Sequence, residues 1–220
     1  MMRFDTVLFD LDGTISDSGL GITRSVAYAL SRFGIQVEDI RSLERFVGPP
    51  LADSFRDFYH FTLEQCAQGI AWYREYYREK GIHETECYPG ICALLRRLHD
   101  SGRAVALATS KPTVFAEKII EEYGVTDCFD LILGCELDGR RGKKTEVMTE
   151  CLQRLGITKE KKDRTVMVGD RNYDVDGAKY CGIHSIAVTY GYAPPGELEA
   201  AGPDFTVHST EQLAALLLNE

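Results

Sequence analysis

Several features that would assign a chain to a class at once are missing from this sequence. No apolar run approaches the roughly 18 residues that a membrane-spanning helix needs, so we expect no membrane partner. The net charge of −9 argues against a nucleic acid polymer as partner, because such binding requires a basic surface. Near the N-terminus Asp5, Asp10 and Asp12 interrupt the apolar stretch, and we therefore expect no signal peptide.

Cysteine and histidine are present without the spacing of a metal site. The seven cysteines include no C-x-x-C pair, and the five histidines include no H-x-x-x-H pair. An odd number of cysteines without a secretion signal favours reduced thiols and a cytoplasmic protein. Cys66, Cys151 and Cys181 lie in helical patterns and are expected to be small core residues. The sequence assigns no other role to the cysteines.

The 220 residues are 44% hydrophobic and 27% charged, which is ordinary for a globular protein with a sizeable core. From about residue 88 onward, short apolar runs alternate with helical patterns, and one further run occurs near the N-terminus. We interpret the runs at 6–9, 104–108, 131–133, 165–168, 185–188 and 205–207 as strands. Such alternation predicts an α/β fold in which helices cover both faces of a parallel, Rossmann-like sheet.

The stretch between the first two of these runs shows only helical patterns. Apolar stripes begin at Ile22, Leu51 and Leu63, and we expect no strand between the opening one and about residue 90. The sequence therefore predicts an α/β core formed by residues 1–15 and 85–220, with an all-helical cap, residues 16–84, inserted into it.

The segment Asp10-Leu11-Asp12-Gly13-Thr14 directly follows the first apolar run. Residues two apart share a face of a strand, and a glycine lets the chain turn sharply afterwards. Two carboxylates aimed at one point could form a metal site or a nucleophile with an acid beside it. A strand that simply runs into an Asp-Gly turn is the alternative.

Polar residues also follow two later strands. Thr109-Ser110 follows one, and Gly169-Asp170, with Asp174 four residues on, follows another. Four cations lie among the five residues 140–144. Taken singly, these are equally typical of a helix N-cap, a turn and a solvated loop. Ligands of parallel sheets bind at the carboxyl ends of strands, however, so we expect one common site.

Taken together, these motifs resemble those of the haloacid dehalogenase-like superfamily of phosphatases. The resemblance spans nearly the whole chain and includes a helical cap between the first two motifs. The stretches 46–51, Phe-Val-Gly-Pro-Pro-Leu, and 189–192, Thr-Tyr-Gly-Tyr, resemble its phosphoglycolate phosphatase and 5′-nucleotidase branch.

The resemblance implies a role for each motif residue. Asp10 would be the nucleophile that forms an aspartyl-phosphate, and Asp12 would be the general acid and then the general base. Thr109 would bind a phosphoryl oxygen, and Lys144 would hold Asp10 and the phosphate. The phosphate-binding residues implied are Asp12, Gly13, Thr109, Ser110 and Lys144.

A magnesium ion is also implied, held by Asp10, Asp12 (through its backbone carbonyl), Asp170 and Asp174. Charge supports a divalent cation, because four carboxylates and a phosphate dianion would meet a single lysine. Like charges about 4 Å apart repel by several kcal/mol at an effective dielectric near 20.

The motif lysine could be Lys143 or Lys144. We favour Lys144, because Thr-Glu-Val-Met at 145–148 resembles the residues that come after the lysine in this branch. The Lys-Pro step common in the family is absent.

The cap is expected to close over the site and contact the leaving group. Its candidate substrate contacts are Arg24, Arg45, Arg56 and His60, and the loop Gly48-Pro49-Pro50 is expected to face the site. From these, Arg45, Gly48 and Pro49 are the predicted specificity residues. The aromatic residues Trp72, Tyr73, Tyr76 and Tyr77 are interpreted mainly as packing, with stacking on a nucleobase as the alternative.

The function predicted is that of a Mg²⁺-dependent phosphomonoesterase for a small phosphorylated metabolite, of the phosphoglycolate or nucleoside 5′-monophosphate type. Asp12 favours phosphate esters, because relatives that cleave other bonds lack an acid two residues after the nucleophile. A sugar-phosphate mutase of the same fold and a non-catalytic binding protein are the alternatives. The substrate and the choice between monomer and dimer stay open.

Overall fold

A six-stranded parallel sheet with strand order β5-β4-β1-β6-β7-β8 forms the centre of the molecule. The structure, a computed structural model, describes residues 4–219. The strands are β1 Thr6–Phe9, β4 Ala104–Pro112, β5 Leu131–Cys135, β6 Thr165–Gly169, β7 His184–Val188 and β8 Phe205–Val207. This confirms the predicted parallel α/β fold.

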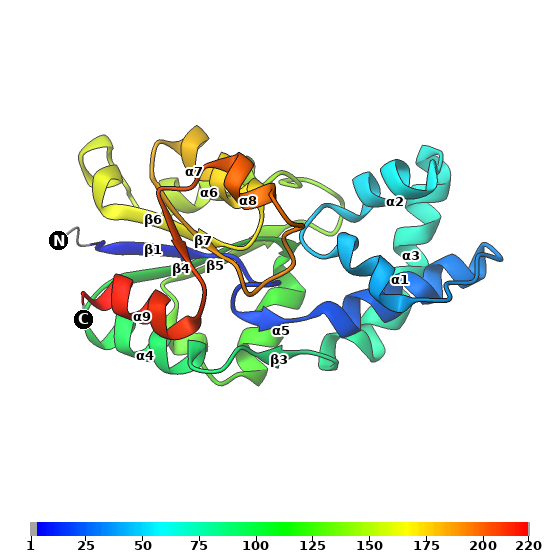
Figure 1. Cartoon of the computed structure of the whole chain (residues 1–220), viewed down its shortest axis with the longest axis horizontal. Coiled ribbons are helices and arrows are strands. Elements are labelled where there is room, and N and C mark those ends of the chain that lie inside the picture. Colours follow the sequence, from blue (N-terminus) through cyan, green and yellow to red (C-terminus); the bar gives the residue numbers. More distant parts are fainter. Residues whose placement is uncertain (1–3, 220) are drawn as a thin grey trace.

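Helices cover both faces of the sheet (Figure 1). Val7 and Phe9 of β1 pack in one apolar cluster with α4, α5 and α9, whereas Leu8 packs on the other face with α6 and α7. Burial on both faces explains why the strands are continuous apolar runs instead of alternating ones. The covering helices are α4 Ile91–Asp100, α5 Thr113–Glu122, α6 Lys144–Arg154, α7 Asn172–Cys181 and α9 Thr210–Leu218, and the short α8, Glu197–Ala201, lies against α7.

The segment between β1 and α4 folds apart from the sheet as three helices that pack on one another (Figure 1). They are α1 Gly19–Arg32, α2 Leu51–Tyr59 and α3 Leu63–Glu79. A capping box starts α3: Thr62 Oγ1 accepts from Gln65 N at 3.3 Å, and Gln65 Oε1 accepts from Thr62 N at 2.9 Å. We propose that residues 16–84 form the cap and that 1–15 and 85–220 form the core. Shorter 3₁₀ turns span Ile40–Phe46, Gly81–His83, Thr126–Cys128 and Lys159–Arg164.

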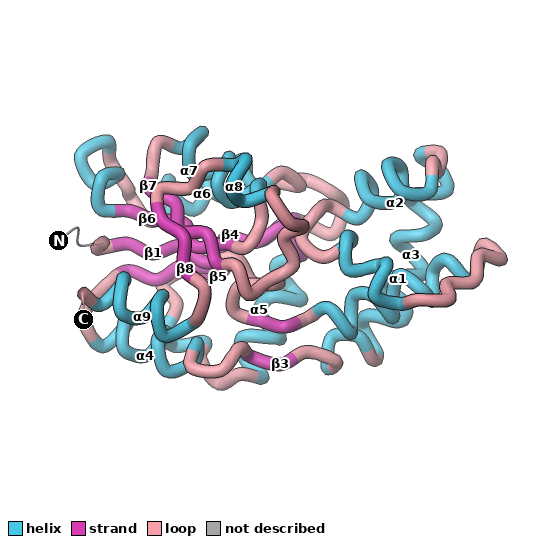
Figure 2. Tube along the Cα trace, viewed as in Figure 1, coloured by secondary structure: helices cyan, strands magenta, loops and turns pink. Residues whose placement is uncertain are grey.

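The expectation of no strand between the opening one and residue 90 was wrong. Ser16–Asp17 (β2) pairs antiparallel with Glu86–Cys87 (β3), so the chain leaves and re-enters the core side by side (Figure 2). Two-residue strands are too short to produce a detectable periodicity.

Strand β4 is longer than the predicted 104–108 and runs to Pro112. Thr109 and Ser110 therefore lie within the strand, and Pro112 is the N-cap residue of α5. The register with β5 shifts between Ala108 and Pro112, which marks an irregularity at this point. Across residues 4–219, no helix is both long enough and apolar enough to cross a membrane.

Candidate active site

Asp10 lies at the carboxyl end of β1, between the ends of the two neighbouring strands. Phe9 pairs with Leu107 of β4 and Val168 of β6, and the Asp10 N–H donates to Val168 O at 2.9 Å. Asp10 and Asp12 are only 3% and 7% exposed. Carboxylates this deeply buried need charged or hydrogen-bonding partners.

Lys144, the first residue of α6, is one such partner. Its Nζ lies 2.8 Å from Asp10 Oδ1 and 2.8 Å from Asp174 Oδ1, and it donates to Ala108 O at 3.0 Å. Burial lowers the pKa of Lys144, but Asp10 and Asp174 outweigh burial and keep that pKa above its usual value. Lys143, by contrast, is exposed. Of the two lysines, Lys144 is therefore the one that contacts the acids.

Three carboxylates gather beside this lysine. Asp10, Asp170 and Asp174 each offer an oxygen, and these oxygens lie within 4.8 Å of one another. Burial, together with Asp174 and Asp10, raises the pKa of Asp170 well above its usual range. Burial and Asp10 raise the pKa of Asp174 to about 6, against the opposing effect of Lys144. A cluster of oxygens short of positive charge fits a hard divalent cation.

Glycines make room for this cluster. A Cβ on Gly13, whose φ is +80°, would lie 2.1 Å from Asp170 Oδ2, and one on Gly191 would lie 2.4 Å from the same atom. That oxygen also accepts from Tyr192 N at 2.7 Å. The close backbone approach shapes a cradle around Asp170 that a larger residue would fill.

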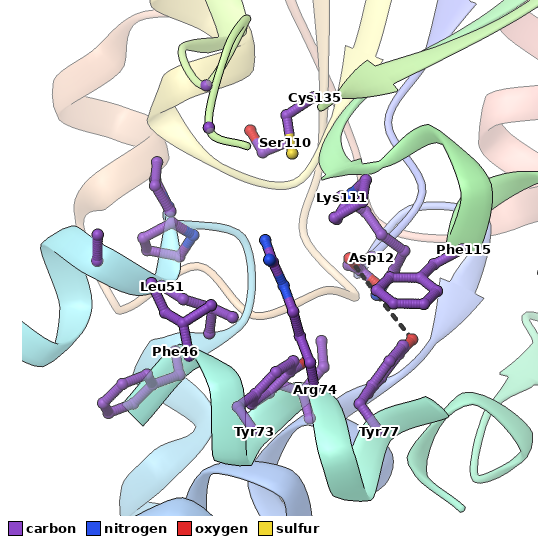
Figure 3. Close-up of a pocket in the computed structure, with 18 of the residues that line it drawn as sticks. Asp12, Phe46, Leu51, Tyr73, Arg74, Tyr77, Ser110, Lys111, Phe115 and Cys135 are labelled. Carbon is purple, nitrogen blue, oxygen red and sulfur yellow. Dashed lines mark hydrogen bonds and ion pairs between the residues drawn. The ribbon is translucent and has the colours of Figure 1, made fainter. Parts of the chain in front are cut away.

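The carboxylate of Asp12 lies outside the three-acid cluster and has a different partner. Lys111 Nζ is 3.1 Å from Asp12 Oδ2 and donates to the Tyr77 hydroxyl at 2.8 Å (Figure 3). Burial lowers the pKa of Lys111, yet Asp12 and Tyr73 raise it overall. Asp12 Oδ1 is buried without a hydrogen-bond partner among residues 4–219.

Sequence reasoning missed Lys111, and its count of one lysine for four carboxylates was wrong. Lys144 and Lys111 are both buried beside acids of the site. Its position directly after Thr109-Ser110, at the end of a predicted strand, was the available signal.

A cavity of about 210 Å³ adjoins Asp12 where α3 and the 46–52 segment of the cap meet the core. Gly48, Pro49 and Ser110, all predicted site residues, line it. Cap and core together supply the rest of the wall, which includes Phe46, Leu51, Ile70, Tyr73, Arg74, Tyr77, Lys111, Phe115, Cys135 and Glu136. Thr109 is 1% exposed, and its Oγ1 accepts from Lys111 N at 3.2 Å.

The four candidate substrate contacts on the cap helices and turns lie elsewhere. Arg24 pairs with Glu84 at 2.6 Å, and the exposed Arg56 pairs with acids of its own helix. Arg45 stacks on Phe58, with 4.3 Å from Cζ to the ring centroid. Neither these arginines nor His60, the left-handed C-cap of α2, line the cavity.

The aromatic residues of α3 divide into two groups. Tyr73 and Tyr77 stack on each other, with ring centroids 5.4 Å apart, and both line the cavity. Trp72 packs on Phe33, and Tyr76 packs on Tyr28. Only the first group is placed where it can contact a ligand.

Arg171, also missed, ties the cap loop to the core. Its Nε and Nη2 lie 2.7 and 3.1 Å from the two carboxylate oxygens of Glu197, and its Nη1 donates to Val47 O. A Cβ on Gly48 would lie 3.0 Å from Arg171 Cγ. The residue after Asp170 thus positions the loop that carries Gly48 and Pro49.

A family model described as "Haloacid dehalogenase-like hydrolase" matches residues 7–188. The chain belongs to this family. It is 40% identical over 215 residues to a Pseudomonas aeruginosa protein named 5'-nucleotidase, covering 98% of the chain and 95% of that relative. It is also 35% identical over 203 residues to "Tyrosine-protein kinase PtkA" of Mycobacterium tuberculosis, covering 92% of the chain and 68% of the relative.

A solved structure described as a predicted phosphatase from Clostridium acetobutylicum superposes with a TM-score of 0.94. It is 44% identical, and the match covers 99% of this chain and 100% of the other. The family resemblance drawn from the strand-end motifs is confirmed, and so is the enzyme class, a phosphatase of the haloacid dehalogenase-like family.

Proposed function

We propose that this protein is a Mg²⁺-dependent phosphomonoesterase that acts through an aspartyl-phosphate at Asp10 on a small phosphorylated metabolite. One observation carries the proposal: the two acids of the first motif have separate partners. Asp10 joins Lys144 and the three-acid cluster, whereas Asp12 pairs with Lys111 and lines the cavity. Separate surroundings let two neighbouring carboxylates perform different chemistry.

Asp10 is the nucleophile in this mechanism. Lys144 and the Leu11 N–H, at 2.8 Å each, hold its Oδ1. The other carboxylate oxygen, Oδ2, attacks phosphorus, the bond from phosphorus to the ester oxygen breaks, and a phosphoryl group is left on Asp10.

Asp12 is the general acid of the first step and the general base of the second. It gives a proton to the departing ester oxygen and then takes one from a water molecule. The oxygen of that water attacks phosphorus, the bond to Asp10 breaks, and inorganic phosphate leaves. Since Asp12 lines the cavity, it faces the space available to the leaving group.

The carboxylates of Asp10, Asp170 and Asp174, with the backbone carbonyl of Asp12, would hold Mg²⁺. The ion would offset negative charge as the phosphoryl group approaches these acids. Gly13, Thr109, Ser110 and Lys144 would bind the phosphoryl oxygens, as donors fixed before the reaction.

The burial of the site favours a small molecule over a protein as substrate. Asp12 is 7% exposed and the adjoining cavity is about 210 Å³. The PtkA relative is named a tyrosine-protein kinase, but Asp10 is only 3% exposed, which disfavours a tyrosine on the surface of another protein as substrate.

Release of inorganic phosphate from a panel of esters tests this function. The panel holds phosphoglycolate, nucleoside 5′-monophosphates, sugar phosphates, pyrophosphate and p-nitrophenyl phosphate, each assayed with Mg²⁺ and with chelator. We expect metal-dependent release that Asp10→Asn abolishes. Interconversion of sugar-phosphate isomers would favour a mutase, and binding without release would favour a sensor.

A further inference from the structure

Arg74 of α3 is a half-buried cation without a carboxylate partner among residues 4–219. Its Nη1 donates to the backbone oxygen of Leu137 at 2.9 Å. Burial lowers the pKa of Arg74, so its surroundings disfavour the charge. A guanidinium has five N–H donors, and one backbone carbonyl satisfies few of them. Charges removed from water are normally paired, which points to a ligand as the missing partner.

The side chain of Arg74 extends from α3 into the cavity, toward Ser110 and Cys135 of the core (Figure 3). The other charged residues that line this cavity already have partners. Lys111 pairs with Asp12, and Glu136 pairs with Arg141. Among the described residues, Arg74 is therefore the cavity-lining cation that has no carboxylate partner. It is available to bind an anionic group or another hydrogen-bond acceptor.

The walls around Arg74 are apolar and aromatic. They include Phe46, Leu51, Ile70, Tyr73 and Phe115. The volume of about 210 Å³ is several times the roughly 30 Å³ that a water molecule occupies in the liquid. Glycolate, with its few heavy atoms, would fill only part of this space and would contact little of the apolar wall. A ring-sized leaving group would use both the volume and the wall.

Taking the phosphatase reaction proposed above as given, we propose that Arg74 determines specificity by donating hydrogen bonds to an acceptor oxygen on a ring-sized leaving group. The substrate class is a nucleoside 5′-monophosphate whose base carries a carbonyl oxygen. The phosphate lies at the acid cluster, the base packs between α3 and the 46–52 segment, and its carbonyl accepts from the guanidinium. Loss of that oxygen leaves donors of the half-buried guanidinium without an acceptor in the cavity, which penalises the wrong substrate.

Inosine and adenosine 5′-monophosphates provide a matched substrate pair, because they differ by a carbonyl and an amino group on the same purine carbon. We expect kcat/KM to be at least about tenfold higher for the inosine ester, the factor that one charged hydrogen bond supplies. Arg74→Met should remove most of that preference, mainly through KM for the inosine ester. Arg74→Lys should restore part of it. Arg78→Met, exposed on the same helix and absent from the cavity wall, is the control and should keep the wild-type ratio.

Three results would overturn the inference. The ratio of the two nucleotides could be unchanged in Arg74→Met, all substrates could lose activity equally, or phosphoglycolate could be preferred over both nucleotides. An equal loss of activity on all substrates would mean that Arg74 has a structural role, through its hydrogen bond to Leu137 O. Failure of the phosphatase proposal looks different, because no ester, including p-nitrophenyl phosphate, would then release phosphate. In that case calorimetric binding of the two nucleotides to Asp10→Asn, with and without Arg74→Met, still decides the assignment, and equal affinities would contradict it.

Discussion

The Nζ atom of Lys111 lies 2.8 Å from the hydroxyl oxygen of Tyr77 and joins core strand β4 to cap helix α3. The same Nζ atom lies 3.1 Å from Asp12 Oδ2. Lys111 and Tyr77 are both buried, where hydrogen bonds are stronger than in water and unpaired donors are costly. The position of the cap and the surroundings of Asp12 are therefore linked through one ammonium group.

Removal of the Tyr77 hydroxyl should weaken that link while the apolar packing of the ring remains. We expect Tyr77→Phe to lower the free energy of unfolding by about 1–3 kcal/mol, because one buried donor of Lys111 loses its acceptor. We expect kcat to fall about tenfold, since Asp12 is then held less well. Tyr76→Phe is the control, because the Tyr76 hydroxyl lies 3.5 Å from Glu84 and outside the cavity. Equal effects of the two changes, measured by denaturant titration and steady-state kinetics, would argue against the link.

Alanine substitutions at the two adjacent lysines, Lys143 and Lys144, should differ sharply in their effects on activity and stability. Lys144→Ala removes the cation that both Asp10 and Asp174 contact, and we expect kcat to fall by about 10²-fold or more. Metal-free Lys144→Ala should also lose about 3–5 kcal/mol of stability, because buried carboxylates are left unpaired. Lys143→Ala, at an exposed position, should behave like the wild type. If the ranking is reversed while both variants keep a native circular dichroism spectrum, Lys143 is the motif lysine.

Gly13 should be required for metal binding as well as for backbone conformation. Gly13 and Gly34 have φ values of +80° and +77°, so alanine at either position costs about 1–2 kcal/mol of strain. A Cβ at Gly13 also meets Asp170 Oδ2 at 2.1 Å, whereas a Cβ at Gly34 meets no atom within 4 Å. We therefore expect Gly13→Ala to weaken Mg²⁺ affinity by at least about tenfold and Gly34→Ala to leave it unchanged. Calorimetric titration with Mg²⁺ measures both, and equal affinities would show that Asp170 does not ligate the ion.

The stabilisation that Mg²⁺ provides should increase with pH. The pKa of Asp174 is raised to about 6, and burial raises the pKa of Asp170 well above the ordinary value near 3.9. The folded metal-free protein thus binds more protons than the unfolded chain, so these groups favour folding less as pH rises through about 6. Mg²⁺ competes with those protons.

Thermal unfolding with and without Mg²⁺ at about pH 5 and about pH 7.5 measures this effect, with a larger rise in Tm expected at the higher pH. Asp174→Asn should make the Mg²⁺-induced rise in Tm nearly the same at the two pH values. Asp176→Asn, exposed on the same helix, should preserve it. A rise in Tm that is the same at both pH values would contradict the assignment of these acids as ligands.

The sequence predicted the parts of the site that each strand carries to its own end. Asp10 and Asp170 directly follow strands β1 and β6, and parallel strands with aligned registers bring such residues together. Local pattern and sheet geometry were sufficient there, because no contact from the cap is involved.

Residues whose role depends on contacts between the cap and the core could not be predicted in this way. Lys111 became a site residue because β4 continues to Pro112 and because Tyr77 approaches it from α3. Arg74 faces the cavity only through the orientation of α3, while Arg45, an equally plausible cation in the sequence, stacks on Phe58 instead. Such positions follow from tertiary packing, which has no local periodicity.

The most direct test of the account is to identify the residue that carries the phosphoryl group. The Asp12→Asn variant should form the intermediate slowly and break it down more slowly still, because the base for the second step is missing. We would mix this variant with substrate and Mg²⁺ and then quench the reaction. The quenched protein would be reduced with borohydride, and the modified peptide would be mapped by mass spectrometry. Conversion of Asp10 to homoserine is the predicted result. Modification of any other residue, or an unmodified Asp10 in protein that has released the leaving group, would contradict the mechanism.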